Sequence, residues 1–166
     1  MDSEELIQTA MELLVPWALK VNRPEGNRLD VFVEPHHLKE AVKALVETQW
    51  GYFSALTGLD QPPAEDGATE GHIEALYHFC RGPVVLSIRT SVPYSNPVIE
   101  SICDVIPSAT LYERELMEMF GVVMPGTPST DRLLLADDWP EGVYPLRKSF
   151  TGLGEQKLEE TDGNAA

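Results

Sequence analysis

Cysteine is scarce in this sequence, and its scarcity excludes several kinds of site. Only Cys80 and Cys103 occur among 166 residues, and their spacing fits neither a metal-binding nor a redox motif. Two thiolates are also too few to ligate an iron–sulfur cluster. A glycine-rich phosphate loop and a dinucleotide-binding fingerprint are both missing. We therefore expect the chain to bind no cofactor of its own.

Long apolar runs and positive charge are equally scarce. The run from Leu13 to Leu19 is interrupted by Pro16, whereas a membrane-spanning helix needs roughly 20 apolar residues. The first residues are acidic, which argues against a secretion signal. The 12 lysines and arginines face 27 aspartates and glutamates, and a net charge of -15 repels nucleic acids and anionic lipids. We expect a folded protein that is not integral to the membrane and prefers a positively charged partner.

Apolar periodicity predicts both helices and strands up to residue 120. Asp2 and Ser3 can cap a first helix that ends or kinks at Pro16. Strands are expected at residues 29–33, 52–59, 73–79 and 84–88, and further helices at residues 38–46, 98–105 and 110–120. The last two strands flank a plausible hairpin turn. The sequence thus predicts an α+β fold, in which helices pack on one face of a mixed sheet of about four strands.

The remainder of the chain, from residue 122 onward, differs in amino-acid composition. Residues 122–150 are dense in proline, glycine and aspartate, yet they keep large apolar side chains that need a surface to cover. We interpret residues 1–121 as an α+β domain that includes the helix at 110–120. Residues 122–150 are expected to form an extended docking arm, and residues 151–166 an acidic, disordered tail.

The helix at residues 110–120 is the most informative segment. Thr110 and Glu113 have the spacing of a capping box, and Gly121 supplies a stop signal. Helical periodicity puts Arg114 and Glu118 together on the side away from the apolar stripe.

In the same helix, Glu115 falls on the edge of the apolar stripe. A carboxylate beside a buried stripe loses hydration unless it meets a cation or several donors. We therefore expect Glu115 to pair with Arg132 or Arg147 and so fasten the arm to the domain. The alternative is an ordinary amphipathic helix with a solvated acidic edge.

Several short motifs in this region resemble one family. They are Tyr112-Glu113-Arg114-Glu115, Glu118-Met119-Phe120-Gly121, Gly126-Thr127-Pro128, Arg132-Leu133-Leu134-Leu135, Asp137-Asp138-Trp139 and Tyr144-Pro145-Leu146-Arg147-Lys148. Together they are similar to the signature of the 30 kDa subunit of respiratory complex I, the NADH-quinone oxidoreductase. Relatives of that subunit occur in membrane-bound nickel–iron hydrogenases. The resemblance is sharp over residues 107–148.

The resemblance implies a noncatalytic assembly subunit in the hydrophilic arm of a proton- or ion-translocating oxidoreductase, on the cytoplasmic side of the membrane. The implied partners are neighbouring hydrophilic-arm subunits and a large subunit related to the complex I 49 kDa subunit and the hydrogenase large subunit. Iron–sulfur clusters and a flavin or nickel–iron centre would belong to those partners. Trp139, Tyr144 and Leu146 are expected as apolar anchors, and Arg114 and Arg147 as charged contacts. The interface or signature residues are Tyr112, Glu113, Arg114, Glu115, Glu118, Phe120, Gly121, Arg132, Asp138, Trp139, Tyr144, Pro145, Leu146, Arg147 and Lys148.

Two positions depart from the family pattern. Thr127 stands where the family usually has histidine or a similar base, and Asp131 where it has a basic residue or proline. The run from Gly142 to Lys148 is somewhat more similar to the hydrogenase branch than to the NADH-oxidising branch. Both branches stay open at this point.

Other functions are also compatible with parts of the sequence. An acidic binding module that masks a basic surface would explain the net charge without any link to electron transfer. A hydrolase could use Glu113, Glu115 and Glu118, but catalysis needs carboxylates that converge on a cleft, and the sequence gives no sign of convergence. His36, His37 and His78 are better explained as helix-entry or strand residues than as metal ligands.

Overall fold

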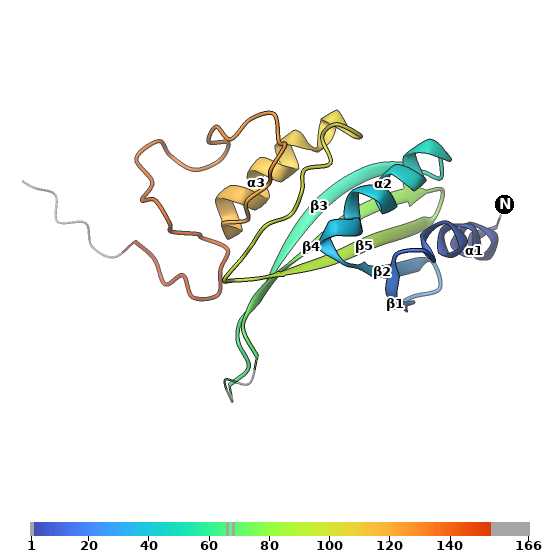
Figure 1. Ribbon diagram of the computed structural model, residues 1–166, viewed down its shortest axis with the longest axis horizontal. Coiled ribbons are helices and arrows are strands. Elements are labelled where there is room, and N and C mark those ends of the chain that lie inside the picture. The colour runs from blue at the N-terminus through green and yellow to red at the C-terminus, as the bar shows by residue number, and fades with distance from the viewer. Residues whose placement is uncertain (1, 66, 68, 154–166) are drawn as a thin grey trace, which may run out of the picture.

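A computed structural model describes residues 2–65, 67 and 69–153. The expected disordered tail falls largely on residues 154–166, outside the described residues. The helices and strands are α1 (Ser3–Leu14), β1 (Ala18–Asn22), β2 (Arg28–Val33), α2 (Leu38–Glu47), β3 (Tyr52–Gln61), β4 (His72–Arg81), β5 (Val84–Pro93) and α3 (Thr110–Phe120). The strands form one mixed sheet in the order β1-β2-β5-β4-β3 (Figure 1). β2 and β5 are parallel, and the other neighbouring strands are antiparallel.

Most of the predicted elements are confirmed within a few residues. α1 begins with a capping box in which Asp2 and Glu5 bind each other's backbone N–H groups, and it ends two residues before Pro16. α3 covers the predicted residues 110–120, and Gly121 ends it in the left-handed conformation with φ of 72°. Local signals such as caps, stops and periodicity therefore predicted these elements well.

Two predictions about secondary structure are wrong. The sheet has five strands rather than four, because β1 was not predicted; its alternation of Leu19 and Val21 with Lys20 and Asn22 is only four residues long, too short to stand out from the preceding apolar run. The helix expected at residues 98–105 does not form. Its backbone instead pairs with the chain after α3, where Ile99 N–H donates to Val123 O at 3.0 Å and Ser101 N–H to Pro125 O at 2.9 Å.

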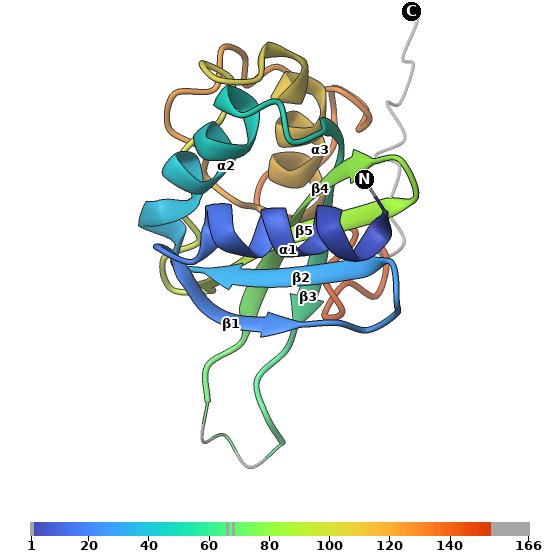
Figure 2. The ribbon, with the colours of Figure 1, turned by 90° about the vertical axis from the view of Figure 1, so that its right-hand side faces the viewer.

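The core lies between one face of the sheet and the helices. Buried side chains on this face include Ile73, Tyr77 and Phe79 of β4, each at most 1% exposed. α1 contacts β2 and β5, α2 contacts β5, and α3 contacts the edge strand β3. Figure 2 shows α1 running alongside β2 and passing in front of β5. Trp50 closes this core by donating its indole N–H to Leu6 O at 3.1 Å.

The opposite face of the sheet is polar. Arg89 donates to Glu74 at 2.8 and 2.9 Å and to Asp30 at 2.8 Å. These hydrogen bonds, the one to Glu74 foremost, raise the pKa of Arg89. His78 lies between the hydroxyls of Ser87 and Thr57, at 2.9 and 3.1 Å, and burial lowers its pKa.

In the part of the chain that the structure describes, no helix is long and apolar enough to cross a membrane.

Helix α3 reaches β3 because Gly58 has no side chain. A Cβ at this position would lie 2.4 Å from the Phe120 ring and 2.7 Å from Leu116 Cδ1. The Gly58→Val substitution should therefore push α3 away from the sheet and lower the free energy of unfolding by about 1–3 kcal/mol. Urea denaturation would measure the loss. Gly26→Ala is the matched control, because a Cβ at Gly26 meets no atom within 4 Å; equal losses in both variants would contradict the packing argument.

Candidate partner-binding surface

The predicted interface residues lie on α3 and on the chain that follows it, residues 122–153, which we name the C-terminal segment. Apart from one isolated bridge at Val123, the segment has no helix or strand. It turns back along α3 and then continues past the end of the sheet (Figure 1). Its path therefore depends on side-chain contacts with α3 and the sheet and on isolated backbone hydrogen bonds, such as that from Val123 N–H to Pro97 O at 2.8 Å.

Glu113 anchors the chain that precedes α3. Its side chain is fully buried, and its carboxylate accepts from Ser101 Oγ at 2.7 Å, from Ile102 N–H at 2.8 Å and from Cys103 Sγ at 3.2 Å. The predicted capping box is wrong, since the N-cap of α3 is Ala109 and no side chain caps it. Buried donors without an acceptor cost free energy, so Glu113 stabilises the fold more by accepting from residues 101–103 than it would by capping the solvent-facing end of the helix.

Arg114 and Glu118 bind the C-terminal segment directly. Arg114 donates to Asp131 O at 2.9 Å and to Arg132 O at 2.8 Å, while the Glu118 carboxylate accepts from the N–H groups of Leu133 and Leu134 at 2.6 and 2.8 Å. Arg114 thus binds the carbonyls of residues 131 and 132, and Glu118 the amides of the next two residues. The two side chains lie on the same side of α3, as the four-residue spacing predicted.

The predicted bridge from Glu115 to an arginine is wrong. Glu115 is exposed and forms no ion pair or hydrogen bond with any residue that the structure describes. Arg132 donates instead to Ala136 O at 3.0 Å and to Trp139 O at 2.7 Å, which closes a loop within the C-terminal segment. The segment packs on the side of α3 that carries Arg114 and Glu118, so Glu115 points to solvent.

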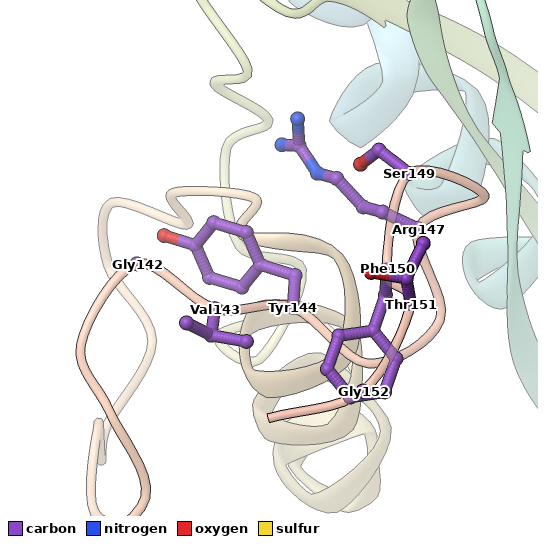
Figure 3. A pocket seen from close by; sticks show the side chains of 8 residues that line it. All are labelled: Gly142, Val143, Tyr144, Arg147, Ser149, Phe150, Thr151 and Gly152. Atoms are coloured by element: carbon purple, nitrogen blue, oxygen red, sulfur yellow. The ribbon is translucent and has the colours of Figure 1, made fainter. Parts of the chain in front are cut away.

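Arg147 holds the far end of the C-terminal segment. Its Nε donates to Phe120 O, the last carbonyl of α3, at 2.7 Å, and its guanidinium lies 4.7 Å from the centre of the Tyr94 ring and 5.1 Å from that of Tyr144. Tyr144 in turn covers Gly121, where a Cβ would lie 2.3 Å from the ring. Figure 3 shows Arg147 and Tyr144 around a cavity of about 310 Å³ formed by residues 142–152.

Two residues that the sequence analysis did not predict also hold the far end of the C-terminal segment. Asp60, at the end of β3, accepts from the Tyr94 hydroxyl and from Lys148 N–H, the latter at 2.7 Å. Burial and the bond to Asp60 raise the pKa of Tyr94 to about 12. Asp60 and Tyr94 lie 34 residues apart in sequence, and Lys148 is 88 residues from Asp60, so no local motif could link them.

The remaining predicted residues have structural contacts or lie on the surface. The Tyr112 hydroxyl donates to Ser54 O at 3.1 Å, and the Trp139 indole donates to Val143 O at 2.8 Å. Pro145 is half-buried, whereas Asp138 and the Lys148 side chain are exposed. Leu146 is 52% exposed, and its N–H donates to Met119 O at 3.2 Å.

The carboxylates of α3 do not converge as a hydrolase would require. Glu113 is buried against residues 101–103, Glu118 binds the C-terminal segment, and Glu115 faces solvent. Within the described ranges, no three histidine, cysteine or acidic side chains are grouped to hold a metal ion. The arrangement shapes a surface and gives no support to an acid–base reaction.

Comparison with known proteins gives consistent matches. A family model described as the respiratory-chain NADH dehydrogenase 30 kDa subunit matches residues 31–156. Membrane-bound hydrogenase subunit beta of Pyrococcus furiosus is 33% identical over 141 residues, which cover 85% of this chain and 80% of that subunit. An NADH-quinone oxidoreductase subunit of Roseiflexus castenholzii is 29% identical over 153 residues, with 89% and 83% covered.

Two further matches concern larger assemblies. Formate hydrogenlyase subunit 5 of Escherichia coli is 32% identical over 139 residues, which cover 82% of this chain but only 24% of that protein. Among solved structures, a chain of the membrane-bound sulfane sulfur reductase, an archaeal respiratory membrane complex, matches with a TM-score of 0.73 and 25% identity. The match covers 90% of this chain and 86% of that one.

The contacts of α3 predict different effects for two nearby glutamates. Glu118→Ala leaves the N–H groups of Leu133 and Leu134 without their acceptor, so we expect it to lower the free energy of unfolding by about 1–3 kcal/mol. Limited proteolysis should also cut sooner within residues 130–140. Glu115→Ala on the same helix is the control, and it should change neither measurement. Similar behaviour of the two variants would contradict the assigned role of Glu118.

The contact between Tyr94 and Asp60 predicts a pH dependence. The folded-state pKa of Tyr94, about 12, exceeds the ordinary value of 10.0, so the contribution of its protonated hydroxyl is complete below about pH 10 and is lost as the pH rises toward about 12. The stability difference between the unmodified protein and Tyr94→Phe, measured by urea denaturation from about pH 9 upward, should therefore shrink. Tyr52→Phe, at an exposed position, is the control. A constant difference for Tyr94→Phe would contradict the hydrogen bond.

Proposed function

This chain belongs to the family of the 30 kDa subunit of the respiratory-chain NADH dehydrogenase, and we propose that it is a structural subunit that packs against the large subunit of its complex. Its relatives are subunits of NADH-quinone oxidoreductases and of hydrogenases. Identities of 33% and 29% to one member of each group favour a role common to both. A structural role can be common to both groups, because it does not depend on which electron donor or acceptor the complex uses.

The main observation in support of the proposal is that charged residues of the family signature form hydrogen bonds within this chain. Arg114, Glu118 and Arg147 each bind the backbone of their own chain, and together they hold the C-terminal segment against α3. A chain that uses its charged residues in this way gains a defined surface. We infer that this surface, built on α3 and the C-terminal segment, is the one that meets the partner.

Exposed leucines support the position of the interface. Leu134 is 60% and Leu146 is 52% exposed, although both belong to a segment that is otherwise attached to the domain. Burying such side chains in a complex would contribute favourable free energy. Trp139 and Tyr144 are half-buried within the segment, so as anchors they would contribute only their remaining exposed surface. The roles of these four residues as partner contacts are part of this proposal.

The lengths of the relatives support a large partner. In formate hydrogenlyase subunit 5 the matching region is about a quarter of the protein, so an equivalent of this chain is covalently joined to a much longer polypeptide. A domain that works as part of one longer chain can work as a separate subunit beside it. We place the protein at the cytoplasmic side of the membrane, attached through the assembled complex, and assign clusters, flavin or nickel–iron centres to its partners.

Affinity purification from native membranes tests the proposal. The chain, carrying an affinity tag and expressed at its natural level, should co-purify with a hydrogenase-like large subunit in equimolar amount. Leu146→Asp should lower the recovery of that large subunit several-fold, because it puts a charge into an apolar contact. Leu19→Asp is the matched control, because it makes the same change at a leucine of β1 that is 63% exposed. Equal losses in both variants would contradict the position of the interface.

The net charge of -15 favours a second candidate, an acidic module that masks a basic surface. The same purification separates the two. Recovery of a soluble basic protein in place of a membrane complex would support the module and contradict the structural subunit.

A further inference from the structure

The outer edge of β3 is open in this structure. β3 is the last strand of the sheet and is ten residues long, and from Tyr52 to Leu59 it contains neither a charged residue nor a proline. Among the described residues, one hydrogen bond reaches its backbone from outside the sheet, from the Tyr112 hydroxyl to Ser54 O. Charged residues and prolines are the usual protection of edge strands against pairing with another chain, and this stretch of β3 has neither.

The opposite edge of the sheet is better protected. β1 has only five residues, includes Lys20, and pairs with β2 through an irregular register between Ala18 and Lys20. Short length and lysine disfavour the addition of a further strand. β3 also has an irregular register, between Phe53 and Ala55, but its pairing is regular from Ala55 to Gln61. The two edges therefore differ in the way expected if β3 alone receives a strand from a partner.

A small cavity of about 120 Å³ lies beside the open edge. Its lining residues are Leu56, Thr57, Gly58, Glu115, Leu116, Phe120 and Leu146. The walls thus come from β3, from α3 and from the C-terminal segment, and four of the seven lining residues, Leu56, Leu116, Phe120 and Leu146, have apolar side chains. The volume suits one aliphatic side chain, and the half-exposed Leu146 at its border would be covered by the same partner.

Glu115 gives this cavity a charge preference. Its neighbours Arg114 and Glu118 bind the C-terminal segment, but Glu115 has no partner in the described part of the chain. An unpaired carboxylate at the border of an apolar cavity selects a basic side chain with an apolar neighbour. The overall charge of -15 would also speed the approach of a basic partner.

We propose that an extended segment of the large subunit pairs with the middle of β3, places an apolar side chain in this cavity and sets a lysine or arginine against Glu115. This inference rests on the proposed function, because it takes the large subunit as the partner. Strand addition supplies backbone hydrogen bonds, while the cavity and Glu115 select the alternate side chains. Glu115, which the sequence suggested as an internal ion-pair partner, is thereby a specificity-determining residue of the interface.

Hydrogen–deuterium exchange tests the strand pairing. The isolated chain and the purified complex that contains it are compared, and peptides covering β3 should exchange at least tenfold more slowly in the complex. Peptides covering β1 are the internal control and should exchange at the same rate in both samples. Unchanged exchange in β3, in a complex that retains the chain, would overturn the inference and leave the proposed function intact. Failure to recover any complex with a large subunit would instead contradict the proposed function.

Charge reversal tests the role of Glu115. Glu115→Lys should weaken retention of the large subunit about tenfold, and Glu115→Gln should weaken it less, because only the first variant adds repulsion. Glu34→Lys makes the same charge change at an exposed residue without a side-chain cap contact and should leave retention unchanged. Urea denaturation should show that all three variants are as stable as the unmodified chain. Equal retention of the Glu115→Lys and Glu34→Lys variants would overturn the assigned role.

Discussion

The shape of the C-terminal segment depends on the hydrogen bonds that side chains of α3 form with its backbone. A segment without helices or strands has no regular backbone hydrogen bonds, so its N–H and C=O groups must find other partners or remain in water. Glu118 supplies an acceptor for two amides, and Arg114 supplies donors for two carbonyls. Charged groups make the stronger hydrogen bonds, which suits them to offset the entropy lost when an irregular chain is ordered. The path of the segment follows from this contact.

The same principle explains how a chain with such an excess of acid can be stable. Several carboxylates accept hydrogen bonds from main-chain N–H groups, among them those of Asp60, Glu113 and Glu118 at 2.6–2.8 Å. In these positions negative charge organises the fold, because each carboxylate meets several donors. Glu115 lies among them without a partner in the described part of the chain, and this contrast makes it informative for function.

Local order was predictable from the sequence, and long-range contacts were not. Periodicity and the Gly121 stop predicted α3 correctly, and the four-residue spacing put Arg114 and Glu118 on one side of it. Nothing in the spacing shows which side of α3 the C-terminal segment covers, so the sequence assigns to Glu115 the role that Glu118 has. Asp60 and Tyr94 were missed for the same reason, since their shared contact joins distant parts of the chain. The strand β1 was missed because its apolar–polar alternation, from Leu19 to Asn22, is only four residues long and directly follows the apolar run from Leu13 to Leu19.

The internal use of Arg114, Glu118 and Arg147 also has a consequence for binding. A segment that became ordered only on association would lose its conformational entropy at that moment, and the complex would be weaker by that amount. Here the segment is already attached to α3 and to the end of the sheet, so the leucines and the cavity beside β3 have defined positions before a partner arrives. The motifs that resemble a family signature thus need not contact the partner to be essential for binding it. They hold in place the surfaces that we propose contact the partner. On this proposal, a substitution such as Glu118→Ala should weaken assembly through the shape of the C-terminal segment, whereas Glu115→Lys should weaken it through direct repulsion.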